Sequence, residues 1–257
     1  MSATASSAAA ARQSGLRLLD PALLTLIALL LWQAVGSWTQ GVAVTGPVAT
    51  FAYTAQLLTT GRFWDNAVAT ASAFAIAFSL SAIFGLLLGL VFGLRRFAGD
   101  VAEPVLAGFY TIPKVTLYPV VLLIFGLGMG AKVAFGVMHG LVPVTLFTIA
   151  DIKTLPPVLP RAARAMRLSP AQTMRWVLMP ACLPQIVAGL RLGFSLSLLG
   201  VLIGEMFSSQ RGLGFLLVSG LAQHNVKLSA AVVLLIVVFA IAANSVMLRF
   251  SRRLARE

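Results

Sequence analysis

The sequence is poor in the residues from which active sites, metal sites and disulfides are built. Its 257 residues include one cysteine, two histidines and seven acidic residues, and only 10% of the chain is charged. The single cysteine, Cys182, excludes an internal disulfide and a C-x-x-C metal pattern. No H-E-x-x-H helix, Ser/His/Asp order or pair of carboxylates at catalytic spacing occurs. We therefore expect no catalytic residue and no metal ligand.

A nucleotide-binding motif is also missing. The glycine-rich stretch GLGMGAK, residues 126–132, lacks the G-x4-G-K-[ST] spacing that cradles phosphate. We therefore expect that the chain binds no cofactor and hydrolyses no ATP. If it transports a solute actively, the energy has to enter from another subunit.

Apolar residues are what the chain has in abundance. It is 59% hydrophobic, with a mean hydropathy of +0.96, far from the balance of soluble proteins. This composition indicates an integral membrane protein in contact with lipid. The net charge of +12 is then typical of lysines and arginines that hold cytoplasmic loops inside, so no nucleic-acid partner is expected.

The apolar segments predict an all-α membrane protein with about six transmembrane helices. Residues 1–15 are small and polar and predict a disordered tail, and residues 254–257 form a second short tail. Residues 16–61 hold the first helix and its outer connection, with a short interfacial helix around 48–59, and the main transmembrane domain is 62–253. A cleaved signal peptide ending near Gly36 is the alternative to a retained first helix. The predicted membrane helices are 21–35, 67–94, 104–126, 132–150, 185–207 and 229–250.

Two of these helices carry local signals. Gly85, Gly89 and Gly93 form a small-xxx-small ladder that lets a neighbouring helix approach closely. The helix at 104–126 is interrupted by Pro113 and Pro119, on either side of Lys114. A broken helix is tolerated in a membrane only where protein or water satisfies the freed backbone groups. This predicts the wall of a translocation path.

The basic residues predict the orientation of the chain. Thirteen lysines and arginines lie in the N-terminal tail, the loop at Arg95, the loop at 151–184 and the C-terminus, against four on the other side. Both termini and the 151–184 loop are therefore expected to be cytoplasmic.

The 151–184 loop is the longest polar interval of the chain. The run RAARAMRL, residues 161–168, predicts a short helix with a small apolar side and three arginines on the other. Such a helix is suited to dock into the groove of a partner protein. Prolines are expected to end the incoming helix, to start a second piece of the loop and to close it, at Pro156, Pro157, Pro160, Pro170, Pro180 and Pro184.

This loop resembles the EAA loop of the permeases of binding-protein-dependent ABC transporters. The family pattern is E-A-A, three residues, G, nine residues and then I-x-L-P. Ala162 and Ala163 match the paired alanines, residues 177–180 match the I-x-L-P end, and Arg161 and Arg167 stand at the Glu and Gly positions. The surrounding sequence is similar to the branch that serves nitrate, sulfonate and taurine uptake, and the resemblance covers residues 62–253.

The resemblance implies a type I ABC importer permease fold with a cytoplasmic coupling helix between helices 4 and 5. The chain would be a transport subunit of a bacterial inner membrane, not an enzyme. Its implied partners are a cytoplasmic ABC ATPase dimer that binds ATP and Mg²⁺, a second permease copy in a homodimer, and a periplasmic substrate-binding protein. The residues implied in coupling are Arg161, Ala162, Ala163, Met166, Arg167, Ser169 and Pro180.

Ionisable residues within the predicted helices are the candidates for contact with substrate, since burying them is costly unless they face water or protein. They are Lys114, His139, Arg191 and Glu205. Arg191 could equally snorkel to lipid headgroups, Glu205 could lie at the outer interface, and His139 could be a hydrogen-bonded core residue. Two cations would suit a small anion of the sulfonate, taurine or nitrate type.

Two alternatives belong to other classes of protein. A membrane-embedded enzyme or scaffold could recruit a soluble partner through the same loop, and it would function without an ATPase. A secondary transporter is typically built from internal inverted repeats, which this sequence does not show.

Overall fold

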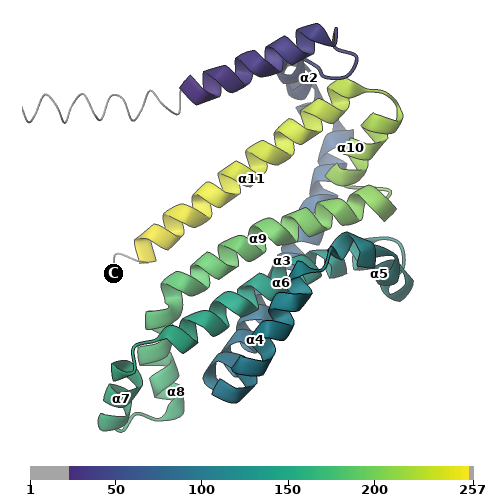
Figure 1. The fold of residues 1–257 in the computed structure, drawn as a ribbon. Helices are drawn as coiled ribbons and strands as arrows, with labels where there is room; N and C mark the ends of the chain where they lie inside the picture. The colour runs from purple at the N-terminus through teal and green to yellow at the C-terminus, as the bar shows by residue number, and fades with distance from the viewer. Residues whose placement is uncertain (1–22, 255–257) are drawn as a thin grey trace, which may run out of the picture.

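The structure is a computed structural model that describes residues 23–254. The predicted tail at 1–15 therefore lies outside the described residues. Within them every regular element is helical, which confirms the predicted all-α fold (Figure 1). The described elements, in chain order, are the helix Leu23–Trp38, α2 (Pro47–Leu58), α3 (Gly61–Leu94), α4 (Arg96–Thr111), η1 (Lys114–Leu117), α5 (Tyr118–Phe125), α6 (Met129–Thr154), α7 (Val158–Ala165), α8 (Pro170–Thr173), η2 (Met174–Leu178), α9 (Met179–Ser208), α10 (Leu213–Ala222) and α11 (Val226–Leu254).

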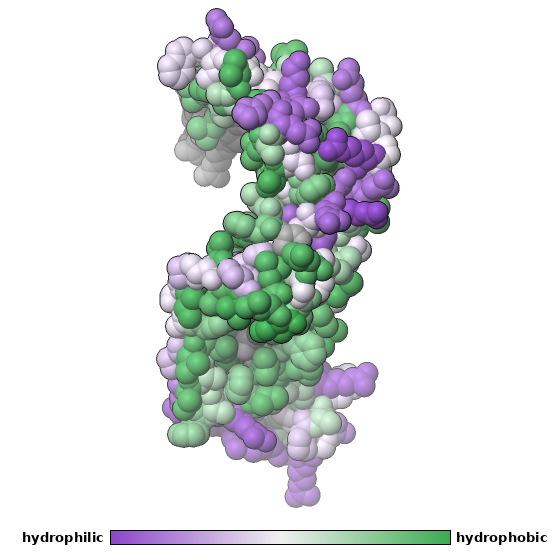
Figure 2. Space-filling model, turned by 90° about the vertical axis from the view of Figure 1, so that its right-hand side faces the viewer, coloured by the Kyte–Doolittle hydropathy of each residue, from purple (hydrophilic) through white to green (hydrophobic). Residues whose placement is uncertain are grey.

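Four described helical spans are long and apolar enough to cross a membrane: α3, α6, Pro170–Phe207 and Val226–Arg249. The pair made of α4 and Lys114–Phe125, which is bent by 86° at the predicted break, counts as a fifth if it is taken as one span. The shorter apolar helix Leu23–Trp38 lies where the first membrane helix was predicted. Figure 2 shows a broad apolar surface with hydrophilic residues gathered above and below it, as a membrane protein requires.

The centre of the molecule is formed by α3, α6 and α9, which pack against one another. The glycine ladder of α3 explains the closest of these contacts. A Cβ atom at Gly85 would lie 2.8 Å from Cβ of Val144, and one at Gly89 would overlap Thr148, both on α6. The prediction that this ladder admits a close neighbour is confirmed, and the two helices cross almost backbone to backbone.

The predicted stop at Pro180 and Pro184 is wrong. Both prolines lie within one helical span, Pro170–Phe207. Pro180 is accommodated because the turn before it is a π-helix, η2, whereas Pro184 lies inside α9. A proline removes the N–H that the carbonyl four residues earlier would use, and a π-turn shifts the hydrogen bonding by one residue. The membrane helix therefore extends beyond its predicted start at residue 185 and into the polar loop.

Other details also differ from the predictions. Helix α3 begins at Gly61, earlier than residue 67, because Thr60 caps it by accepting a hydrogen bond from the Phe63 N–H at 3.4 Å. Helix α4 begins at Arg96, so α3 and α4 are joined at Arg95 without a loop. The short helix α10 was not predicted, whereas α2 confirms the segment expected around 48–59.

Candidate functional site

Helix α7 and the turn after it form the first candidate site. We call residues 155–169 the α7 loop; Figure 1 places α7 at one end of the molecule, beyond the ends of the long helices. The helix spans Val158–Ala165 and so begins and ends three residues before the predicted 161–168. Pro160 was expected to end the incoming helix, but it lies in the first turn of α7, where its missing N–H has no helical partner to lose.

Arg167 ends the α7 turn in a left-handed conformation, with φ of 56°. The Leu168 N–H donates to the Ala163 carbonyl at 3.0 Å, and the Arg167 N–H donates to the Arg164 carbonyl at 3.0 Å. These two bonds define a Schellman motif, in which glycine is the usual left-handed residue. The backbone thus gives a physical reason for the glycine in the E-A-A pattern, which Arg167 replaces here.

Ser169 fixes the next turn through a capping box. Its hydroxyl accepts from the Gln172 N–H at 3.2 Å, and the Gln172 side chain accepts from the Ser169 N–H at 2.8 Å. This arrangement starts α8 at Pro170, as predicted, and leads directly into η2 and α9. The α7 loop is therefore held at a defined angle to the long span that follows it.

The predicted coupling residues do not all face outward. Ala163 is only 1% exposed because α7 packs against η2, so this chain itself covers that side chain. Met166 is 61% exposed, and Arg161, Ala162, Arg167, Ser169 and Pro180 are exposed as well. The surface available to a partner is consequently the side of α7 that carries Ala162, Met166 and the arginines.

The charge of this surface is of one sign. Residues 155–184 contain four arginines and no acidic residue, and Arg175 lies 5.6 Å from the ring of Trp176, which is itself exposed. The arginines of α7 were predicted from the sequence to lie on this surface, whereas the exposed Trp176 beside Arg175 was not. An exposed basic surface with an aromatic residue can contact acidic groups.

A second candidate site lies at the break between α4 and α5. Lys114 is 8% exposed; its Nζ donates to the Tyr110 carbonyl at 3.2 Å and lies 4.7 Å from the centroid of the Tyr110 ring. His139 on α6 is also 8% exposed, and its Nδ1 lies 2.9 Å from the Phe135 carbonyl. His139 lies near the same break, because the Phe135 ring packs on the His139 ring with centroids 4.6 Å apart and on the ring of Tyr118, the first residue of α5, with centroids 4.9 Å apart.

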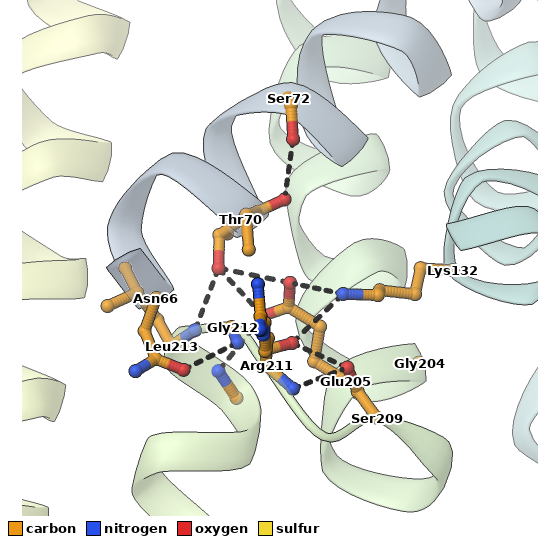
Figure 3. A network of polar contacts seen from close by, with 12 residues as sticks. Asn66, Thr70, Ser72, Lys132, Gly204, Glu205, Ser209, Arg211, Gly212 and Leu213 are labelled. Carbon is orange, nitrogen blue, oxygen red and sulfur yellow. Dashed lines mark hydrogen bonds and ion pairs between the residues drawn. The ribbon is translucent and has the colours of Figure 1, made fainter. Parts of the chain in front are cut away.

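The other two predicted path residues have partners elsewhere. The Nε of Arg191 donates to Oδ1 of Asn244 at 2.6 Å, which ties α9 to α11. Glu205 is fully buried in a network of its own near the end of α9 (Figure 3). The four residues therefore form no single site in this chain.

The Glu205 cluster consists of Asn66, Thr70, Lys132, Glu205 and the backbone of residues 211–214. The Glu205 carboxylate accepts from the Thr70 hydroxyl at 2.8 Å and from the Gly214 N–H at 3.0 Å, and it pairs with Nζ of Lys132 at 3.5 Å (Figure 3). A carboxylate buried in this way is stable only because charge and hydrogen bonds compensate its lost hydration.

The rest of the cluster holds the turn between α9 and α10. Nζ of Lys132 donates to the Arg211 carbonyl at 2.9 Å, Oδ1 of Asn66 accepts from the Gly212 N–H at 2.8 Å, and the Thr70 hydroxyl accepts from the Leu213 N–H at 2.7 Å. Gly212 has φ of 129°, and a Cβ there would overlap the Glu205 carboxylate. These contacts make the cluster a joint between α3, α6, α9 and α10.

Sequence reasoning missed most of this cluster. Lys132 was predicted to be the first residue of the fourth helix and was counted among the cations on the outer side, and Asn66 and Thr70 were not singled out at all. The glycines of the R-G-L-G run after Glu205 were the one available signal, because they allow a backbone to approach a buried side chain closely. Within residues 23–254 no group of three His, Cys, Asp or Glu side chains could hold a metal ion.

Comparison with known proteins agrees with this architecture. The chain is 29% identical to a probable ABC transporter permease protein of Haemophilus influenzae, over 86% of this chain and 91% of the relative. It is 27% identical to the taurine transport system permease protein of Escherichia coli, over 61% of this chain and 57% of the relative. It is 25% identical to the nitrate import permease protein of Synechococcus elongatus, over 74% and 71%.

A solved structure shares the fold. The MetNI methionine ABC transporter in an inward-facing conformation superposes with a TM-score of 0.58 at 21% identity, covering 72% of this chain and 92% of the other. The family model of the binding-protein-dependent transport system inner membrane component matches residues 81–256, about two thirds of the sequence. The chain therefore belongs to this family of inner-membrane components, the permease subunits of ABC transporters.

Proposed function

We propose that this chain forms the translocation path of an ATP-driven importer for a small anionic solute, and that the α7 loop couples the path to a separate ATPase. The observation that carries the coupling is the α7 loop itself. Its paired alanines and its 177–180 end match the E-A-A pattern, its backbone is preorganised by the Schellman motif and the capping box, and its outer side is exposed. A helix held ready in this way loses little conformational entropy when a partner binds it.

The mechanism follows from the connection of α7 to α9. A cytoplasmic ATPase dimer binds the exposed side of α7, and its closure on ATP and Mg²⁺ moves the loop. Because α8, η2 and α9 form one span, the movement reaches the membrane helices directly. Two copies of the chain line the path, a periplasmic binding protein delivers the solute, and both termini lie in the cytoplasm.

The class of solute is supported by two observations. Relatives are named for the transport of taurine and nitrate, and one of Bacillus subtilis is a putative aliphatic sulfonates permease. Lys114 places a buried cation at the break in the α4–α5 span, and the imidazole of His139 on α6 lies near this break. A positive environment inside the membrane favours an anionic solute.

The coupling is tested by recovering the ATPase with tagged chain from detergent-solubilised membranes. Ala162→Asp places a negative charge on the exposed side of α7, where it should abolish recovery of the ATPase and ATP-dependent uptake. Ala163 is a poorer choice, because its side chain is buried in this chain and an aspartate there would also disturb the loop. The matched control is Ala222→Asp, the same change at an exposed alanine at the end of α10, distant in sequence from the α7 loop.

The expected result is an ATPase that accompanies the wild type and Ala222→Asp but not Ala162→Asp, with all three present in the membrane at similar amounts. If Ala162→Asp retains both the ATPase and uptake, α7 is not the coupling element. If the wild type functions without any ATPase, a membrane enzyme or scaffold is the better description.

A further inference from the structure

The two buried lysines of this chain differ in their counter-charge. Lys132 has the Glu205 carboxylate at 3.5 Å, whereas Lys114 has no carboxylate within ion-pair distance among the described residues. A lysine ammonium has three donors, and for Lys114 the structure shows one hydrogen bond, to the Tyr110 carbonyl. A buried ammonium in this state has lost hydration without gaining a compensating anion.

Lys114 lies at the break of the span, beside residues that are partly exposed. The side chain lies where α4 has ended and η1 begins, and its neighbours Ile112 and Val115 remain 42% and 43% exposed. The Tyr110 ring, which contacts the ammonium, is itself 39% exposed. The buried lysine therefore lies at an interruption of the helix, next to partly exposed side chains.

His139 adds a second polar group beside Lys114. The Phe135 carbonyl can only accept, so the Nδ1 of His139 carries the hydrogen in their 2.9 Å contact. The other ring nitrogen, Nε2, makes no hydrogen bond within residues 23–254. The ring is held in place by Phe135, whose ring centroid lies 4.6 Å away. The site thus combines an uncompensated cation with an oriented imidazole.

We infer that the ammonium of Lys114 binds the oxyanion group of the transported solute, a sulfonate, nitrate or carboxylate, while the solute passes the break between α4 and α5. This inference rests on the proposed function and names the contact that selects for negative charge. An oxyanion would supply the missing counter-charge and accept from the ammonium hydrogens that Tyr110 does not use.

A structural role for Lys114 has to be separated from this one. Its bond to the Tyr110 carbonyl also caps the end of α4, where a cation is favourable to the helix dipole. Lys114→Gln keeps a hydrogen-bond donor for that carbonyl and removes the charge, whereas Lys114→Arg keeps both. Lys114→Met removes both. The control is Arg96→Gln, which removes an exposed cation at the other end of α4.

The experiment is uptake by proteoliposomes that contain the chain with its ATPase and binding protein, with radiolabelled taurine, ethanesulfonate and nitrate as the probes. The wild type, Lys114→Arg and Arg96→Gln should transport the same probe at similar rates. Lys114→Gln and Lys114→Met should lose at least about tenfold in transport efficiency, because each loses a charge-assisted contact. Basal ATPase activity equal to that of the wild type shows that a variant complex is assembled.

The outcomes separate this inference from the proposed function. If the wild type transports one of the probes and Lys114→Gln matches it, the lysine is only a cap and the inference is wrong, while the importer stands. If the assembled wild type transports none of the three anions, the proposed solute class fails and the inference fails with it.

Discussion

The two ends of the Pro170–Phe207 span differ in whether their charged side chains are buried and paired or exposed and unpaired. Near its last turn, the Glu205 carboxylate is fully buried and receives all of its hydrogen bonds and its counter-ion from the same chain. Near its first turn, the arginines of the α7 loop are exposed, and residues 155–184 contain no acidic residue to pair with them. The charge at the Glu205 end is therefore paired within the chain, whereas the positive charges at the α7 end are not.

This difference separates internal structure from recognition. Breaking a buried, satisfied ion pair leaves a charge without hydration, so changes in the Glu205 cluster should affect stability. Exposed charges contribute little to stability, so changes in the α7 loop should affect binding to other molecules. Lys114 lies between these cases, because it is buried like Lys132 and unpaired like the arginines.

The largest effect on stability is expected from removing the buried Glu205 carboxylate. Glu205→Ala leaves Lys132 without its counter-ion and Thr70 without its acceptor. We expect a loss of about 3–5 kcal/mol in stability, measured as a large fall in the thermal unfolding midpoint of the purified chain in detergent. Adding Lys132→Met should recover part of this loss, because the unpaired cation is then gone. A double variant less stable than Glu205→Ala would show that Lys132 is not held by that charge.

A smaller effect is expected from the backbone of the same cluster. Gly212→Ala combines an unfavourable φ of 129° with overlap between the new Cβ and the Glu205 carboxylate, and should cost about 3 kcal/mol. Gly41→Ala is the matched control, because Gly41 has a positive φ of 74° but open space around its Cβ position. It should cost only about 1 kcal/mol. Equal unfolding midpoints for the two variants would mean that overlap with the Glu205 carboxylate adds nothing to the loss of stability.

The smallest effect should appear at the other end, and with the opposite sign. Arg167→Gly relieves a left-handed backbone at φ of 56° and should stabilise the α7 turn by about 1 kcal/mol. Hydrogen exchange at the Leu168 amide, which bonds to the Ala163 carbonyl, should slow about fivefold. Arg164→Gly places glycine within the helix and should speed the same exchange. Slower exchange in both variants would contradict the Schellman description.

The helices that sequence predicted best are those with long apolar runs. Length and hydropathy alone place α3, α6 and the bent α4–α5 span, and the glycine ladder indicates which side of α3 meets a neighbour. The predicted stops at Pro160 and Pro180 failed for one reason. Proline is costly only where its N–H is needed, and a first helical turn or a π-turn does not need it.

The candidate sites also differ in how well the sequence predicted them. The α7 loop was recognisable because its residues are consecutive, whereas the Glu205 cluster joins Asn66, Thr70 and Lys132 from two other helices. No local pattern in a sequence reports contacts between residues more than a hundred positions apart. Lys114 and His139 were singled out individually, but only the structure shows that both lie near the break between α4 and α5.

The continuity of the Pro170–Phe207 span has a mechanical consequence. Its 38 residues, at 1.5 Å each, make a rod of roughly 57 Å that begins at the capped turn after α7 and ends beside Glu205. The span is continuous, although it contains the π-turn η2 and Pro184, so we expect a displacement at its first turn to be passed on toward its last turn. The buried ion pair and the hydrogen-bonded turn beyond it then fix the last turn of the span to α3 and α6, so that the span would pivot at this point.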